Sequence, residues 1–240
     1  SKIEELAKIA EEHAELNRRA ARKNNEIAKE AAELWKRAAE KHVRIAERAA
    51  DAIRKAAKSE AAKTALKLIK ENAEDAKEAA RRALELAKES AERNTRAAEE
   101  ADKLSKDAAR TAREARREDA LKKAADKAAE ASRRAVELNK KAAEDHHRAN
   151  ETAARLAERA SRHLIEALER AVRAAARELE DEKALREAKE LAERAARENR
   201  EALKEAKELA KRNSEKAKES AKEHKKLAED ANKRAEEATR

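Results

Sequence analysis

The last sixty residues, Asp181 to Arg240, read DEKALREAKELAERAARENREALKEAKELAKRNSEKAKESAKEHKKLAEDANKRAEEATR. Small, apolar or polar uncharged residues recur in this stretch at alternating steps of three and four, which keeps one stripe of an α-helix facing a partner helix. The stripe positions are Leu185, Ala188, Ala192, Ala195, Asn199, Ala202, Ala206, Leu209, Asn213, Ala217, Ser220, His224, Leu227, Ala231, Ala235 and Ala238. The stretch therefore predicts one long helix whose packing face is mostly alanine.

The same spacing recurs in three preceding segments, and Ser59, Asp119 and Asp181 are good N-cap residues before three of the four runs. Ala, Glu, Lys, Arg and Leu dominate the chain, and they are strong helix formers. We predict an all-α fold, an antiparallel up-down-up-down bundle of four long alanine-rich helices in a single domain over residues 1–240. Each helix is expected to have about 56–60 residues, within the approximate bounds 2–57, 60–117, 120–179 and 182–239.

An alternative architecture has about eight shorter helices in a repeat-like stack. It places further turns at Asn24-Asn25, Asn94-Thr95, residues 150–152 and Asn213-Ser214. A turn usually resets the three-four phase, and the phase continues through all four places. The pattern therefore favours four helices.

Composition excludes several function classes. The net charge of +9 is spread thinly among interleaved acids, and Trp35 is the only Phe, Trp or Tyr residue, so no nucleic-acid partner is expected. No apolar run has membrane-spanning length and no leader is evident, so we expect a soluble chain with no membrane partner, suited to recombinant cytoplasmic expression, and the natural localisation stays unknown. Cysteine is absent, which excludes disulfides and thiol chemistry.

No enzyme motif accompanies the helical pattern. The chain has no glycine, so it lacks a phosphate-cradling loop, and nothing resembles a nucleophile elbow. We therefore predict no catalytic residues, no metal site, no cofactor and no small-molecule substrate.

Polar residues interrupt the alanine stripe at intervals. They are His13, Asn17, Asn24, His42, Asn72, Asn94, Asn139, His146, Asn199, Asn213 and His224. An alanine seam slides by a heptad at little cost, whereas a displaced Asn or His leaves hydrogen-bonding groups unpaired. We interpret these positions as buried polar layers that set helix register.

Counting from the predicted turns groups the layers. His13 falls near His224, and the same level includes Asn17, Ser132, Asn139 and Ser220. His42 falls near His163, with Asn72 and Asn199 at that level. His146 falls near Asn24, Asn94, Asn213 and Ser214. The alternative interpretation is a haem-, porphyrin- or metal-binding bundle whose core histidines ligate the group, with His42 and His163 facing one another and His13 and His224 as a second pair.

The restricted alphabet, the filler KEAKELAK, the equal segments and the N-cap residues resemble those of de novo designed helical bundles. That resemblance implies a structural scaffold or assembly building block without a natural substrate. Residues 213–240 also resemble late-embryogenesis-abundant proteins in their Ala, Lys and Glu content, although the seven-residue phase favours design. Extra alanines beside the last stripe leave room for self-association into a homo-oligomer; they are Ala196, Ala210, Ala221 and Ala228.

Overall fold

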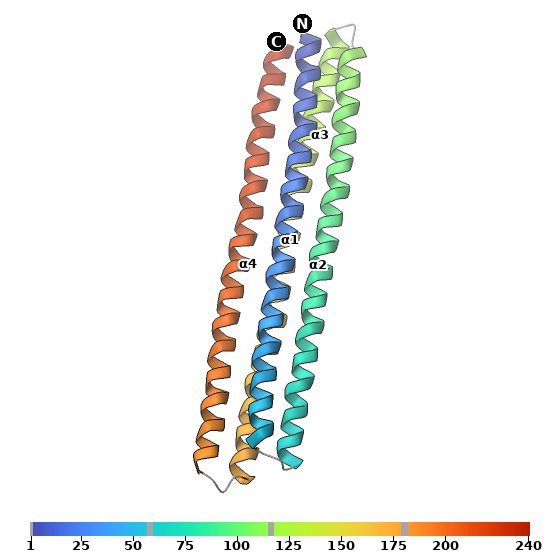
Figure 1. Ribbon diagram of the computed structural model, residues 1–240. Helices are drawn as coiled ribbons and strands as arrows, with labels where there is room; N and C mark the ends of the chain where they lie inside the picture. Colours follow the sequence, from blue (N-terminus) through green and yellow to red (C-terminus); the bar gives the residue numbers. More distant parts are fainter. Residues whose placement is uncertain (1, 57–59, 115–117, 179–181) are drawn as a thin grey trace. The chain divides into compact units, whose positions relative to one another are not determined.

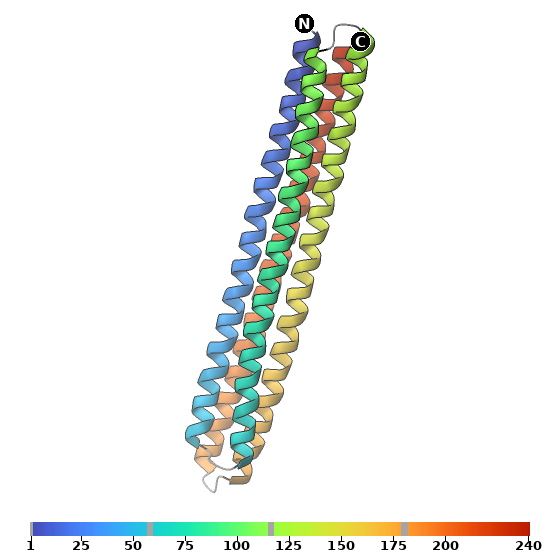
Figure 2. The same ribbon diagram turned by 90° about the vertical axis from the view of Figure 1, so that its right-hand side faces the viewer.

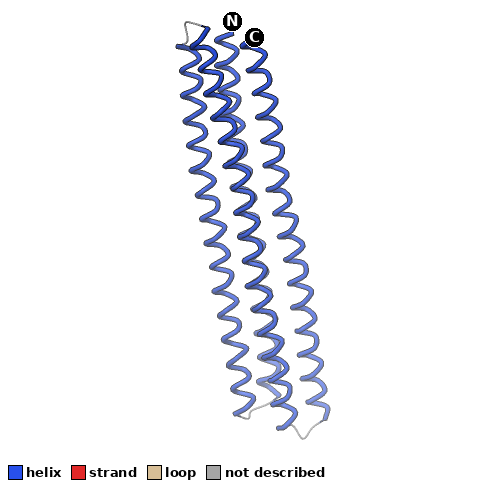
Figure 3. Tube along the Cα trace, turned by 180° about the vertical axis from the view of Figure 1, so that it is seen from behind, coloured by secondary structure: helices blue, strands red, loops and turns tan. Residues whose placement is uncertain are grey.

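The computed structural model describes residues 2–56, 60–114, 118–178 and 182–240, apart from the side chains at 56, 61, 90, 94, 97, 101, 118 and 184. It contains four α-helices (Figure 1): α1 (Lys2–Ala56), α2 (Glu60–Glu114), α3 (Glu118–Glu178) and α4 (Glu182–Thr239). Within the described ranges, every residue except Arg240 is helical (Figure 3). The predicted all-α, four-helix bundle is confirmed.

The helix boundaries differ from the predicted ones by a few residues. The helix α2 ends at Glu114 and α3 already begins at Glu118, so Asp119 lies inside α3 and is not its N-cap. Ser59 and Asp181 lie outside the described residues. Every one of the four suspected interior turns is helical, so the eight-helix alternative is wrong. Helix-forming neighbours and the uninterrupted seam outweigh the turn preference of Asn and Thr.

The helices contribute to two compact units, and each unit takes a piece of all four. The first unit comprises Ser1–Glu30, Ala87–Arg148 and Asn213–Arg240, and the second comprises Ala31–Leu86 and Ala149–Arg212. Each unit is described by itself below. The prediction of a single domain stays a prediction.

In the first unit, ion pairs link neighbouring helices. Glu12 and Glu30 of α1 bind Arg234 and Lys216 of α4, so the residue numbers rise on one helix as they fall on the other and the two helices are antiparallel. The first turns of α1 accordingly lie beside the last turns of α4 (Figures 1 and 3). Leu6 and Ile9 supply the bulk of a core that is otherwise alanine from the other three helices.

In the second unit, the same four helices surround a larger apolar core. Its fully buried branched side chains are Ile53, Ile69, Leu164 and Leu168, from α1, α2 and α3. The helix α2 has α1 on one side and α3 on the other (Figure 2). The alanines of α4 complete the core, because a methyl side chain allows close approach of the backbones.

The buried face of α4 is centred slightly off the predicted stripe. Leu209 and Leu227 belong to the stripe yet are 42% and 40% exposed, whereas the neighbouring Ala210 and Ala228 are buried. Each helix of a four-helix unit contacts two neighbours, so its buried face is wider than a single seam. Ala210 and Ala228 are therefore used within the bundle and are not part of a spare surface for self-association.

Two leucines of the second unit differ in burial, so their replacement by alanine should lower the free energy of unfolding by different amounts. Leu164→Ala should lower the free energy of unfolding by about 2–5 kcal/mol, because it leaves a cavity in the packed core. Leu209→Ala should change it by only about 0.5 kcal/mol, since that side chain is half exposed. Denaturant unfolding followed by circular dichroism measures both values. Equal losses in the two variants would contradict the described packing.

Candidate functional site

Ten of the predicted polar-layer residues are buried. They are His13, Asn17, Asn24, His42, Asn72, Asn139, His146, Asn199, Asn213 and His224. The side chain of the eleventh, Asn94, lies outside the described residues. His163 is exposed, so the structure does not bring it into a buried site with His42. His163 stands one place off the stripe, and on a helix that offset turns a side chain by about 100°.

His42 is the centre of a hydrogen-bonded circuit in the second unit. Asn199 of α4 donates from Nδ2 to His42 Nδ1 at 2.7 Å, and the His42 Nε2 atom lies 2.9 Å from Asn72 Oδ1 on α2. Asn72 Nδ2 donates to the Ala160 carbonyl oxygen on α3 at 2.9 Å, and Ser161 Oγ donates to Asn199 Oδ1. The circuit leaves α3 at Ser161, passes through α4, α1 and α2, and returns to α3 at Ala160.

The direction of these hydrogen bonds determines which nitrogen of the neutral His42 ring carries the proton. Nδ1 accepts from an amide N–H, so the proton of the neutral ring sits on Nε2, where Asn72 Oδ1 accepts it. A second proton on Nδ1 would face the Asn199 amide hydrogens. Burial lowers the pKa of His42, and the bond to Asn72 opposes that shift only in part.

Smaller clusters occupy the first unit. His146 Nε2 bonds with Asn213 Oδ1, whose amide donates to the Ile27 carbonyl oxygen at 3.0 Å, as the predicted grouping of His146 with Asn213 requires. Asn24 pairs with Asn139, with an Nδ2 to Oδ1 distance of 2.5 Å, and both line a small cavity together with Asn17 and His224. Asn139 therefore lies with Asn17 and His224 as predicted, and Asn24, predicted with His146, meets it there.

Three buried polar residues that stand off the predicted stripe also form hydrogen bonds. Ser105 accepts a bond from Asn17 at 3.5 Å, Ser161 belongs to the His42 circuit, and Asn150 accepts a bond from Trp35 Nε1 at 3.2 Å and donates to the Ala210 carbonyl oxygen at 3.3 Å. Each stands one place after an apolar stripe residue. The stripe has two positions in each heptad, and these residues occupy the position that follows one of them. A pattern with three inward-facing positions per heptad includes them.

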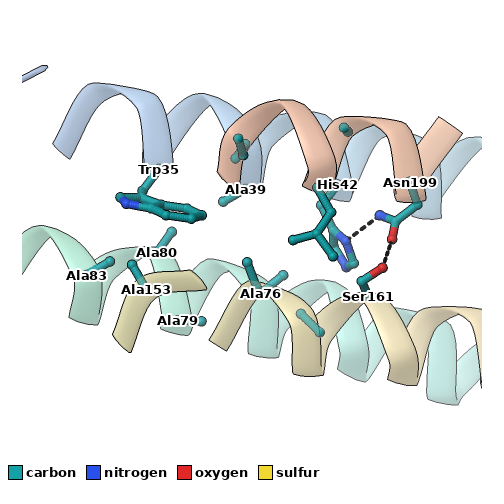
Figure 4. Close-up of a pocket in the computed structure, with 16 residues that line it drawn as sticks. Trp35, Ala39, His42, Ala76, Ala79, Ala80, Ala83, Ala153, Ser161 and Asn199 are labelled. Atoms are coloured by element: carbon teal, nitrogen blue, oxygen red, sulfur yellow. Dashed lines mark hydrogen bonds between the residues drawn. The ribbon is translucent and has the colours of Figure 1, made fainter. Parts of the chain in front are cut away.

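A cavity of about 50 Å³ lies in the second unit between Trp35 and His42 (Figure 4). Alanines from all four helices make most of its wall, the indole of Trp35 lines one end, and His42, Ser161 and Asn199 line the other. An empty cavity of this size costs about 1 kcal/mol at about 24 cal/mol per Å³. The alanine-rich packing of the second unit is thus open at this level.

The cavity is too small for the cofactor of the alternative prediction. Sites for drug-sized ligands and cofactors have volumes of about 300–1,000 Å³, whereas a single water needs about 10–15 Å³. The two ring nitrogens of His42 are also already hydrogen-bonded. Axial ligation of a porphyrin by His42 and His163 therefore does not fit this part of the fold.

Comparisons with known proteins supply no relative. A scan against protein-family models, a search of curated proteins and a search of solved structures each returned no match. Among the described residues, no helix has an apolar stretch able to cross a membrane. The same residues contain no group of three or more His, Cys, Asp or Glu side chains placed to hold a metal ion.

The buried histidines predict a loss of stability in mild acid. Burial, followed by the charge of His13, lowers the pKa of His224 from 6.5 to about 4, and burial also lowers the pKa values of His13, His42 and His146. Between these pH values the unfolded chain binds more protons than the folded one, so stability is complete above pH 6.5 and falls toward pH 4. His224 alone accounts for about 3 kcal/mol of this loss.

Unfolding by denaturant across this pH range measures the effect. The variant His224→Gln should have a shallower pH dependence, since Gln keeps an N–H for Asn17 and does not titrate. The exposed His163→Gln change should leave the curve as it is. A stability that stays constant from pH 7 to pH 4 would refute the assignment of neutral buried rings.

Proposed function

We propose that this chain is a designed structural scaffold or assembly building block, without catalytic activity of its own, in which buried polar circuits set the order and register of the helices. The observation that carries this proposal is the closed circuit from Ser161 through Asn199, His42 and Asn72 to the Ala160 carbonyl oxygen. Self-association as a building block belongs to the same proposal.

The energetics of buried polar groups support this role. A buried amide or imidazole left without a partner costs about 1–3 kcal/mol. Sliding or exchanging one helix of the second unit would break several bonds of the circuit together, whereas the alanine contacts around it would change little. The circuit therefore penalises wrong arrangements more than it stabilises the correct one.

Replacement of the whole circuit tests the proposal. The quadruple variant His42→Leu, Asn72→Leu, Ser161→Ala and Asn199→Leu removes every side chain of the circuit together, so it should unfold no more easily than the single variant His42→Leu, which strands two amides. Register is then measured between spin labels on α1 and α4 of the second unit. The exposed Lys36 and Lys204 are suitable sites for Lys→Cys labelling because the chain has no cysteine of its own.

The labelled parent protein should give one narrow distance distribution, and the quadruple variant a broad or multiple one. The same labels in a His163→Leu background provide the control, since His163 is exposed in the same unit. An equally narrow distribution in the quadruple variant would show that apolar packing alone sets the register, and would overturn the proposal.

A further inference from the structure

Two buried polar residues that line one small cavity of the first unit each have an atom without a hydrogen-bond partner among the described residues. The atoms are Nδ2 of Asn139 on α3 and Nδ1 of His224 on α4, in side chains only 8% and 5% exposed. The cavity has a volume of about 20 Å³, and Asn17 and Asn24 of α1 also line it. Two unsatisfied polar groups therefore border the same space.

The bonds that each residue does make determine what its free atom can offer. Asn17 Oδ1 can only accept, and it lies 3.0 Å from His224 Nε2, so the proton of the neutral ring is on Nε2 and Nδ1 has a free lone pair. Asn24 donates to Asn139 Oδ1, which leaves the Asn139 amide hydrogens as donors. Burial, followed by the charge of His13, lowers the pKa of His224 to about 4, so the ring is neutral at neutral pH. The two residues thus offer one donor and one acceptor.

Contacts between α3 and α4 place Asn139 and His224 at similar heights in the unit. Two hydrogen bonds join these helices on either side of that level: Ser132 with Asn232, and His146 with Asn213. Asn139 is midway between the two contacts on α3, and His224 is within two residues of the midpoint on α4. At about 1.5 Å of rise per residue, their heights differ by no more than about 3 Å.

We propose that this cavity binds one water molecule, which accepts a hydrogen bond from Asn139 Nδ2 and donates one to His224 Nδ1. The volume of about 20 Å³ exceeds the roughly 10–15 Å³ that one water needs and is far below the roughly 300–1,000 Å³ of sites for larger ligands. A buried water takes about two to four polar partners, and Asn139 and His224 supply two of them.

The larger cavity of the second unit does not share this character. Its polar lining residues are Trp35, His42, Ser161 and Asn199. Each of them is hydrogen-bonded, and none has a buried polar atom left without a partner among the described residues. A water in that cavity satisfies no unpaired group, so unpaired partners rather than volume distinguish the proposed site.

The water completes a second polar circuit, in the first unit. The path runs from Ser105 of α2 to Asn17 of α1 and His224 of α4, and through the water to Asn139 of α3 and Asn24 of α1. It joins all four helices, as the circuit of the second unit does. Any effect of this path on helix register rests on the proposed function, whereas the water site rests only on the cavity and its two unpaired atoms.

Nuclear magnetic resonance of the ¹⁵N-labelled full chain at pH 7 tests the site. The side-chain amide protons of Asn139 should show cross-peaks to water of opposite sign in NOESY and ROESY spectra, which distinguishes a bound water from proton exchange. The ¹⁵N shifts of His224 should show a protonated Nε2 and an unprotonated Nδ1. Asn139 amide protons without a contact to bound water, or a proton on Nδ1 of His224, would overturn the proposal.

Matched variants remove the site without stranding a neighbour. The double variant Asn24→Leu and Asn139→Leu removes a bonded pair of amides together and fills the cavity, so ¹⁷O relaxation dispersion should count one long-lived water fewer than in the parent protein. His224→Gln retains an N–H toward Asn17 and removes the Nδ1 lone pair, so the water should exchange about ten-fold faster, as expected for one lost hydrogen bond. The exposed His163→Gln variant should match the parent protein.

Equal water counts in the parent protein and the double variant, or unchanged water exchange in His224→Gln, would contradict the proposed site. Circular dichroism of each variant confirms that the helices are retained. None of these results bears on the spin-label measurement in the second unit, so the water site and the proposed function can fail independently.

Discussion

The requirement that buried amide and imidazole groups find hydrogen-bond partners is the constraint on which the rest of this structure depends. Alanine makes up most of the seams, and its methyl group has little shape with which to distinguish one register from another. We propose that the circuit around His42 supplies that distinction, because each member has a specified donor or acceptor on another helix. On that proposal, stability and specificity come from different residues: branched side chains such as Leu164 for the first, and Asn and His for the second.

The fold follows from the sequence because helix formation is local and the seam has a strict period. Uninterrupted phase through Asn24-Asn25 correctly predicts continuous helix there, despite the turn preference of asparagine. The lateral position of the buried face is harder to predict, since it depends on the angles at which two neighbouring helices approach. Leu209 is exposed and Ala210 buried for that reason, and Asn150 and Ser161 escape a search restricted to one stripe.

The pairing of polar residues on different helices is the hardest feature to predict, because it depends on contacts far apart in the sequence. The sequence predicts that His42 shares a level with Asn72 and Asn199, and the hydrogen bonds agree. It does not predict that Asn24 pairs with Asn139, because an error of a few residues in a turn shifts all later heights by about 1.5 Å per residue. A hydrogen bond is lost when its donor and acceptor are displaced by less than this. The sequence therefore predicts which residues are helical, whereas the hydrogen-bond partners are known only from the three-dimensional structure.

The two units show how the number of partners decides what a buried histidine can do. His42 has an acceptor on one side and a donor on the other, so its ring is locked in one neutral form and is chemically silent. His224 has an acceptor at Nε2 alone, and its Nδ1 atom has no hydrogen-bond partner among the described residues. Burial disfavours protonation in both cases. On the proposed role the saturated His42 ring specifies helix register, whereas the His224 ring keeps one nitrogen that no other described residue engages.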